Sequence, residues 1–149
     1  MKRARIRGLI GTVALSLAAC STAATPQPDQ TARLDFTGAD GFVYLASPYT
    51  CDARQQQSGD AARGTEIAAG GILWVERWAI SHRGRTKTYC KAAASFAPQA
   101  GRTYVSDFRK DGAGCSLQIY RVEASGEKVP EPSEHQEPVL SCGYRFQGG

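Results

Sequence analysis

From about residue 34 onward, short runs of aromatic and β-branched residues alternate with clusters of Gly, Pro, Asp and Ser. This alternation is typical of short β-strands joined by turns. It predicts strands at residues 41–47, 72–81, 86–96, 103–109, 115–123 and 139–146, with a short edge strand at 33–36. Helical spacing fits poorly, although residues 59–69 could form one or two turns.

The segment ILWVERWAIS, residues 72–81, is apolar on both faces of the strand that it predicts. One face carries Ile72, Trp74, Trp78 and Ile80, and the other carries Leu73, Val75 and Ala79. A strand of this kind is usually central in a sheet that is covered on both sides. Gly84 and the Asp111-Gly112 pair favour turns that join the following strands into a meander over residues 72–123. We therefore expect an all-β fold, a small antiparallel β-sandwich or barrel.

Charged residues gather in two of the expected connections. Basic side chains crowd the hairpin after residue 81, and these are His82, Arg83, Arg85, Lys87 and Lys91. The segment EKVPEPSEHQEP carries Glu127, Glu131, Glu134 and Glu137, and its three prolines indicate a long acidic loop. Solvated connections are the reading we favour for both. The alternative is that His82, Arg83, Arg85 and Lys87 form a binding surface that steers a partner.

The N-terminus has the pattern of an export signal. Four basic residues in MKRARIRG precede a mainly apolar run of eleven residues at positions 9–19. This run is too short to cross a bilayer as a helix, which needs about 20 residues.

The residues Leu17, Ala18, Ala19 and Cys20 resemble the lipobox of bacterial lipoproteins. The resemblance implies that the signal peptide 1–19 is removed and that Cys20 carries a diacylglyceryl group, with palmitate as a further acyl chain. Two or more chains anchor a protein stably to a membrane. Ser21 then implies sorting to the outer membrane, with the domain facing the periplasm. An ordinary cleaved signal that contains a cysteine is the alternative.

Residues 20–33 contain no aromatic residue and are rich in Thr, Ala, Pro and Gln, so we expect a lipid-anchored flexible linker. Residues 34–149 then form one β-sandwich domain. Without the signal, 14 of the 18 basic residues remain against 14 acidic ones, so the formal net charge falls from +4 to zero. This balance gives no reason to expect a nucleic-acid partner.

The remaining cysteines are Cys51, Cys90, Cys115 and Cys142, an even number in an exported chain. Two disulfides are expected. Four cysteines allow three connectivities, of which we favour Cys51 with Cys90 and Cys115 with Cys142. The spacing contains no CxxC pair, so we expect no metal site.

The sequence carries no enzyme signature and implies no cofactor, so we expect a protein that is not an enzyme. His82 and His135 both fall in expected connections, where a catalytic triad is hard to assemble. The large aromatic residues are expected in the core, with a ligand platform as the alternative. They are Trp74, Trp78, Tyr89, Phe96, Tyr104, Phe108 and Tyr120.

Two further resemblances concern the folded domain. IAAGGILWVERW followed by ASFAPQAGRTYVSDF resembles small envelope lipoproteins with a PEGA-like β-domain, through Gly70, Gly71, Phe96, Ala100, Gly101 and Tyr104. That resemblance implies a sandwich and no activity. SPYTCDA, residues 47–53, is similar to the Tyr-x-Cys start of periplasmic inhibitors of C-type lysozyme.

Together these patterns predict a lipid-anchored lipoprotein of the cell envelope that acts as a binding or scaffolding module. Its expected partners are the membrane, through the anchor, and envelope proteins or cell-wall components. The alternative function is inhibition of a cell-wall hydrolase.

Overall fold

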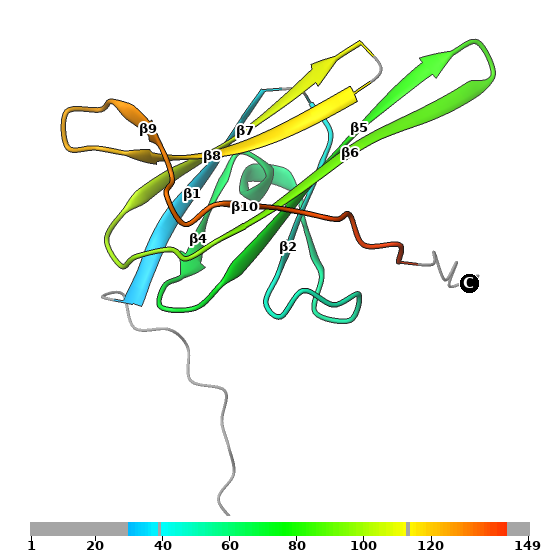
Figure 1. Ribbon diagram of the computed structural model, residues 1–149. Coiled ribbons are helices and arrows are strands. Elements are labelled where there is room, and N and C mark those ends of the chain that lie inside the picture. The colour runs from blue at the N-terminus through cyan, green and yellow to red at the C-terminus, as the bar shows by residue number, and fades with distance from the viewer. Residues whose placement is uncertain (1–29, 39, 113, 143–149) are drawn as a thin grey trace, which may run out of the picture.

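The computed structural model describes residues 30–38, 40–112 and 114–142, which form two five-stranded β-sheets packed face to face (Figure 1). Sheet A has the order β4 (Gly64–Ala68), β1 (Thr31–Gly38), β7 (Thr103–Asp111), β8 (Gly114–Val122) and β9 (Lys128–Pro130). Sheet B has the order β10 (His135–Glu137), β6 (Thr86–Phe96), β5 (Leu73–Arg83), β2 (Phe42–Ala46) and β3 (Gln55–Gln57). The expected small β-sandwich is confirmed.

The core lies between the sheets and follows from the alternation of side chains along each strand. From β7, Tyr104 and Phe108 point inward and are fully buried, and Leu117 and Ile119 do the same from β8. Phe96 of β6 meets Tyr104 across the interior, with ring centroids 4.9 Å apart. The expectation that Phe96, Tyr104 and Phe108 are core residues is confirmed.

Strand β1 differs from the expected edge strand, because it lies between β4 and β7 inside sheet A. Its alternate residues Ala32 and Leu34 are buried in the core. It pairs parallel to β7, and the other pairings of the described residues are antiparallel. It begins at Thr31, so the last three residues of the predicted linker belong to the sandwich.

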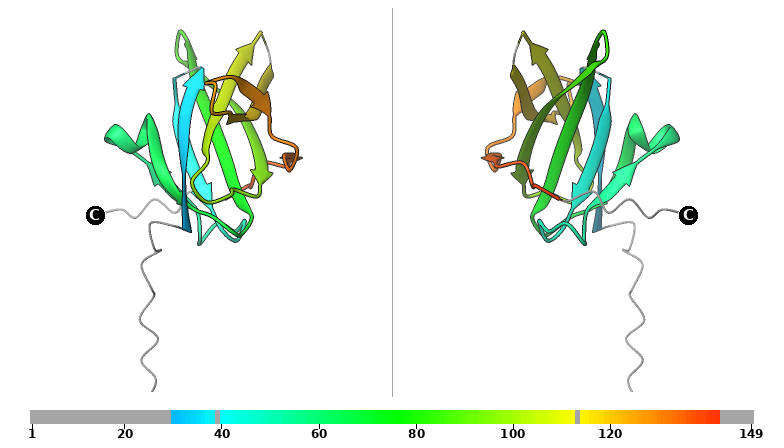
Figure 2. Two further views of the ribbon diagram at one scale, coloured as in Figure 1. Left: turned by 90° about the vertical axis from the view of Figure 1, so that its left-hand side faces the viewer. Right: turned by 90° about the vertical axis from the view of Figure 1, so that its right-hand side faces the viewer.

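The expected meander is wrong, although its strands are in place. β5 and β6 form one hairpin in sheet B, and β7 and β8 form another in sheet A. The chain crosses from one sheet to the other between them, and both hairpins extend from the same end of the sandwich (Figure 2). Gly84 turns the first hairpin with a φ of +60°, a conformation that favours glycine.

Strand β5 is central in sheet B, as its two apolar faces predict, and it also buries two charges. Arg77 points between the sheets and donates to the carbonyl oxygen of Ser106 at 3.1 Å. Burial lowers the pKa of Arg77 to about 10, and Asp107 opposes that shift. Glu76 points to the outer face of the sheet and is 2% exposed.

The end of the described chain differs from the expected loop and last strand. The segment predicted as a long acidic loop contains β9 and β10, and β10 adds to sheet B beside β6. Residues 139–142 form no strand, and 143–146 lie outside the described residues. In the predicted helical segment 59–69, only Gly59–Ala62 is helical, as a 3₁₀ turn labelled η2, and β4 follows.

Both disulfides form, but the favoured pairing is wrong. Cys90 is bonded to Cys115, and Cys51 is bonded to Cys142. Alternation places Cys90 on the inner face of β6 and Cys115 on the inner face of β8, so the two meet between the sheets. The segment with Cys142 crosses sheet B instead of returning beside β8, which brings it to Cys51.

The predicted signal peptide, Cys20 and the linker up to residue 29 lie outside the described residues. Within the part of the chain that the structure describes, no helix is long and apolar enough to cross a membrane.

Candidate functional site

A groove of about 570 Å³ lies on the outer face of sheet B, across strands β2, β5 and β6 with the adjoining β3. We call it the aromatic groove. Its lining residues are Phe42, Tyr44, Gln56, Trp78, Ile80, Tyr89 and Lys91. The strand register explains how they gather, because Trp78 pairs with Phe42 on one side and with Lys91 on the other. Ile80 and Tyr89 form the next pair outward along the same face.

The rings of the groove form a connected series with different exposure. Tyr44 lies 5.3 Å from Trp78 between ring centroids, and Tyr89 meets Trp78 edge to face at 6.4 Å. Trp78 is only 2% exposed, whereas Phe42 and Tyr89 are 37% and 52% exposed. Trp78 is therefore the floor of the groove, and the other two rings offer apolar surface to solvent.

Two cations lie over these rings. The Lys91 ammonium is 3.6 Å from the centroid of the Trp78 ring. The Arg54 guanidinium is 3.6 Å from the Tyr44 centroid and 4.6 Å from that of Trp78. Contacts of this kind contribute about 0.5 to 2 kcal/mol, depending on how far the cation is desolvated. Lys91 is exposed, so its charge remains accessible to a ligand.

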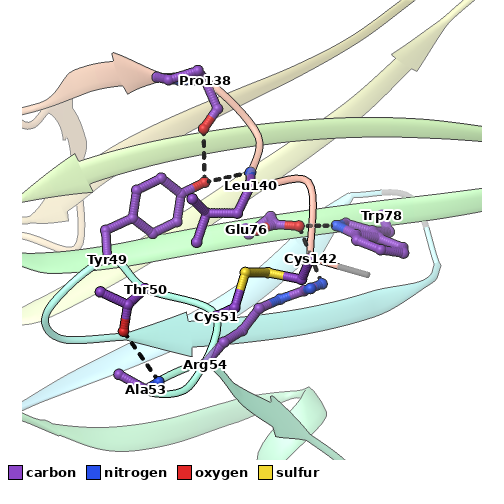
Figure 3. Close-up of a disulfide and its surroundings, with 10 residues drawn as sticks. All are labelled: Tyr49, Thr50, Cys51, Ala53, Arg54, Glu76, Trp78, Pro138, Leu140 and Cys142. Carbon is purple, nitrogen blue, oxygen red and sulfur yellow. Dashed lines mark hydrogen bonds and ion pairs between the residues drawn. A yellow bond between two sulfur atoms is a disulfide. The ribbon is translucent and has the colours of Figure 1, made fainter. Parts of the chain in front are cut away.

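A buried carboxylate next to Trp78, on the same outer face of β5, holds the floor in place. The Trp78 indole N–H donates to Oε1 of Glu76, and Arg54 forms an ion pair with the same oxygen at 3.1 Å (Figure 3). The Arg54 side chain is 10% exposed and that of Glu76 is 2% exposed. Glu76 thus fixes both the indole and the guanidinium, and its charge is balanced by Arg54.

A strap made of the β2–β3 connection and residues 138–142 covers the part of sheet B next to the groove. The Tyr49 ring stacks on that of Trp74, with centroids 5.7 Å apart. Its hydroxyl donates to the carbonyl oxygen of Pro138 at 2.9 Å (Figure 3). The Leu140 N–H donates back to that hydroxyl at 3.3 Å. Desolvation raises the pKa of Tyr49 to about 12, and the Glu76 charge adds to the effect.

The expected basic surface lies at the outer end of the same hairpin. His82 pairs with Lys87 across the hairpin, and alternation puts both on the face of the groove, next to Ile80 and Tyr89. Arg85 is exposed in the turn, and Arg83 pairs with Thr86. Lys91, grouped with them in the sequence, lies inside the groove.

The acidic residues of the expected loop have structural contacts, so solvation is the wrong description for three of the four. Glu131 is 6% exposed and accepts from the Ser133 hydroxyl at 2.7 Å. Glu134 accepts from the Ile119 N–H at 2.8 Å, and Glu137 accepts from the Ser95 hydroxyl at 2.6 Å. Glu134 contacts sheet A and Glu137 contacts sheet B, so these two hold β10 and the turn before it in place, whereas Glu131 fixes Ser133 within that turn.

His82 and His135 are both exposed and belong to different strands, β5 and β10. In the described residues, no group of three or more His, Cys, Asp or Glu side chains is arranged to hold a metal ion.

Sequence reasoning missed most of the groove. It placed Trp78 and Ile80 on one face of a strand, but that strand is apolar on both faces and gives no sign of which one faces outward. Tyr89, expected in the core, is 52% exposed on the outer face of sheet B. Trp78 is buried as expected, but it is buried on that outer face and not between the sheets. Phe42, Tyr44 and Gln56 carried no signal, because only the pairing of β2 and β3 with β5 brings them to the groove.

No family model, curated protein or solved structure matches this chain.

Proposed function

We propose that this chain is a lipid-anchored lipoprotein of the cell envelope, and that its β-sandwich is a binding or scaffolding module with the aromatic groove as its binding surface. The groove is the observation that carries the proposal. Phe42 and Tyr89 expose large apolar surface beside a cation, within a concave site of about 570 Å³. Concave apolar sites with a few polar groups are typical ligand sites.

The proposed location comes from the sequence. Leu17, Ala18, Ala19 and Cys20 resemble a lipobox, and Ser21 fits sorting to the outer membrane with the sandwich in the periplasm. The partners are then the membrane, through Cys20, and envelope proteins or cell-wall components. The proposal includes neither a catalytic residue nor a nucleic-acid partner.

The anchor is tested by labelling cells with a fatty acid while they produce the wild-type chain or the Cys20→Ala variant. The wild type is expected to take up label and to sediment with membranes, and Cys20→Ala is expected to do neither. Equal labelling of the two chains would disprove the anchor.

The binding surface is tested by crosslinking in intact cells, followed by mass spectrometry of the captured envelope material. Tyr89→Ala removes an exposed ring from the groove, and we expect it to reduce capture. Ile72→Ala is the matched control, because Ile72 is equally exposed at 52% and lies outside the groove. Capture that is unchanged in Tyr89→Ala would argue against the groove as the binding surface.

Inhibition of a cell-wall hydrolase is the second candidate, and the shape of the β5–β6 hairpin favours it. The hairpin extends beyond the end of the sandwich (Figure 1) and carries the exposed His82, Arg85 and Lys87. A protruding basic hairpin suits an acidic active-site cleft. In a turbidity assay, we expect an inhibitor to slow the clearing of a cell suspension by lysozyme. The double variant Arg85→Glu/Lys87→Glu is expected to lose this effect, so that clearing returns to its full rate. Clearing at the full rate in the presence of excess protein would eliminate this candidate.

A further inference from the structure

We propose that the aromatic groove binds a glycan whose sugar rings carry free carboxylates. This inference rests on the proposed function of the groove and names its ligand class. Three features of the groove support it: the backbone beneath it, the ring surfaces that it exposes, and its charge.

The backbone groups of the central strand under the groove are already hydrogen-bonded within the sheet. Strand β5 pairs with β2 on one side and with β6 on the other, and the row Phe42, Trp78 and Lys91 runs across all three strands. An extended peptide that binds by strand addition needs unpaired backbone groups at a sheet edge. Recognition on this floor must therefore use side chains.

Those side chains offer ring surface together with hydrogen-bonding groups. Tyr89 and Phe42 expose apolar ring surface, and Trp78 closes the floor between them. A pyranose ring has one face of C–H groups that can pack on such surface, while its hydroxyls project from the ring edge. The Gln56 amide and the Lys91 ammonium line the same groove and provide hydrogen-bond partners for these hydroxyls. This combination fits a sugar better than a purely apolar ligand.

The charge of the groove selects an acidic sugar. Its described lining includes Lys91 and no acidic residue. The nearest buried carboxylate, that of Glu76, is paired with Arg54. His82 and Lys87 continue the same face next to Ile80 and Tyr89. Lys91 is exposed over Trp78, where its ammonium can pair with a carboxylate on a ring that packs against Tyr89.

The test compares two tetrasaccharides with the same backbone, using the full chain purified in detergent and isothermal titration calorimetry. One alternates N-acetylglucosamine with N-acetylmuramic acid freed of its peptides, so that it carries lactyl carboxylates. The other, chitotetraose, lacks the lactyl groups. We expect the carboxylated probe to bind about fivefold tighter at low salt, with the preference lost at high salt, as for a solvent-exposed charge pair.

Two substitutions separate the charge from the ring. Lys91→Gln is expected to remove the preference for the carboxylated probe, so that the two probes bind this variant with similar affinity. Tyr89→Ala is expected to weaken both probes about tenfold, since aromatic side chains are enriched among the residues that dominate a binding site. Lys128→Gln on β9 and Ile72→Ala are the matched controls, and both should bind like the wild type.

Equal binding of the two probes, or a preference that survives in Lys91→Gln, would overturn carboxylate recognition. If neither glycan binds and an acidic peptide binds in a manner that depends on Tyr89, a glycan is not the ligand of the groove. The proposed function as a binding module would still hold in that case. In-cell capture that does not depend on Tyr89 bears on the proposed function itself, so the two failures are distinguishable.

Discussion

Glu76 is the residue on which the floor of the aromatic groove depends. Its carboxylate is buried on the outer face of sheet B, where it accepts from the Trp78 indole and pairs with Arg54. A buried charge is tolerated only when it is paired, and removing one partner leaves the other uncompensated. Arg54 therefore has two roles, since it balances Glu76 and packs over the Tyr44 ring.

Arg54→Met is expected to lower the free energy of unfolding by about 3 kcal/mol, because it leaves the Glu76 carboxylate buried without a counter-ion. The double variant Arg54→Met/Glu76→Gln should recover a large part of that loss, since its amide still accepts from Trp78. Urea unfolding of the wild type, both single variants and the double variant measures the coupling. A double variant less stable than Arg54→Met would contradict this account.

Tyr49 is expected to make stability fall in alkaline solution. Its pKa is raised from 10 to about 12 by burial, with the Glu76 charge as a further cause. Above pH 10 the unfolded chain releases this proton more readily than the folded chain, so stability is lost as the pH rises toward 12. Thermal midpoints at about pH 9 and about pH 11 should therefore drop further for the wild type than for Tyr49→Phe. Equal drops would show that Tyr49 is not responsible.

Strand β2 forms part of the groove between β3 and β5. Its position depends on the close approach of Gly41, just before the strand, to the backbone of β5. It lies between β5 and β3 and contributes Phe42 and Tyr44 to the groove. Gly41 comes directly before it, where a Cβ atom would lie 1.8 Å from the carbonyl oxygen of Trp78. The clash would be with backbone, so it could be relieved only by a shift of β2 relative to β5.

Gly41→Ala is therefore expected to destabilise the sandwich by about 1 to 3 kcal/mol, the usual range for overpacking, and to weaken any ligand of the groove. Gly71→Ala is the matched control, because no atom lies within 4 Å of the Cβ position at Gly71. Thermal unfolding of both variants tests the contrast. Equal midpoints would mean that β2 can move away from β5 at little cost.

The whole sandwich is tied together by two disulfides of different span. Cys90–Cys115 joins the two sheets and closes a loop of 25 residues. Cys51–Cys142 joins the two segments of the strap, the β2–β3 connection and residues 138–142, and closes a loop of 91 residues. In the chain-entropy model, loops of these lengths stabilise by about 3.5 and about 4.6 kcal/mol. Both values are large against the roughly 5 to 15 kcal/mol that stabilise a typical domain.

Replacing either cysteine pair by alanine is expected to lower the free energy of unfolding by about 2 to 4 kcal/mol. Cys51→Ala/Cys142→Ala should also raise the exposure of Trp74 to a fluorescence quencher, since it releases the strap that carries Tyr49. Peptide mapping without reductant should recover Cys51 with Cys142 and Cys90 with Cys115. Recovery of Cys51 with Cys90 would contradict the observed arrangement.

The strands of the two long hairpins were predictable because their signals are local. The run at residues 86–96 begins with Thr86, Thr88 and Tyr89 and ends with Phe96, has turn residues on both sides and forms β6 over the same residues. Gly84 fits its turn through its own φ preference, with no help from distant residues. The all-β class and the use of four cysteines in two disulfides follow from the same kind of information.

The arrangement of those strands required contacts between residues far apart in the sequence. Both faces of β5 are apolar, so the pattern could not show that Val75 faces the core while Trp78 faces outward. The cysteine pairing depends on β10 joining β6 instead of the last segment returning to β8. The groove exists only because β2, β5 and β6 lie side by side. Local preferences set the conformation of each strand, whereas its partner and its outward face depend on the apolar surface that all strands bury together.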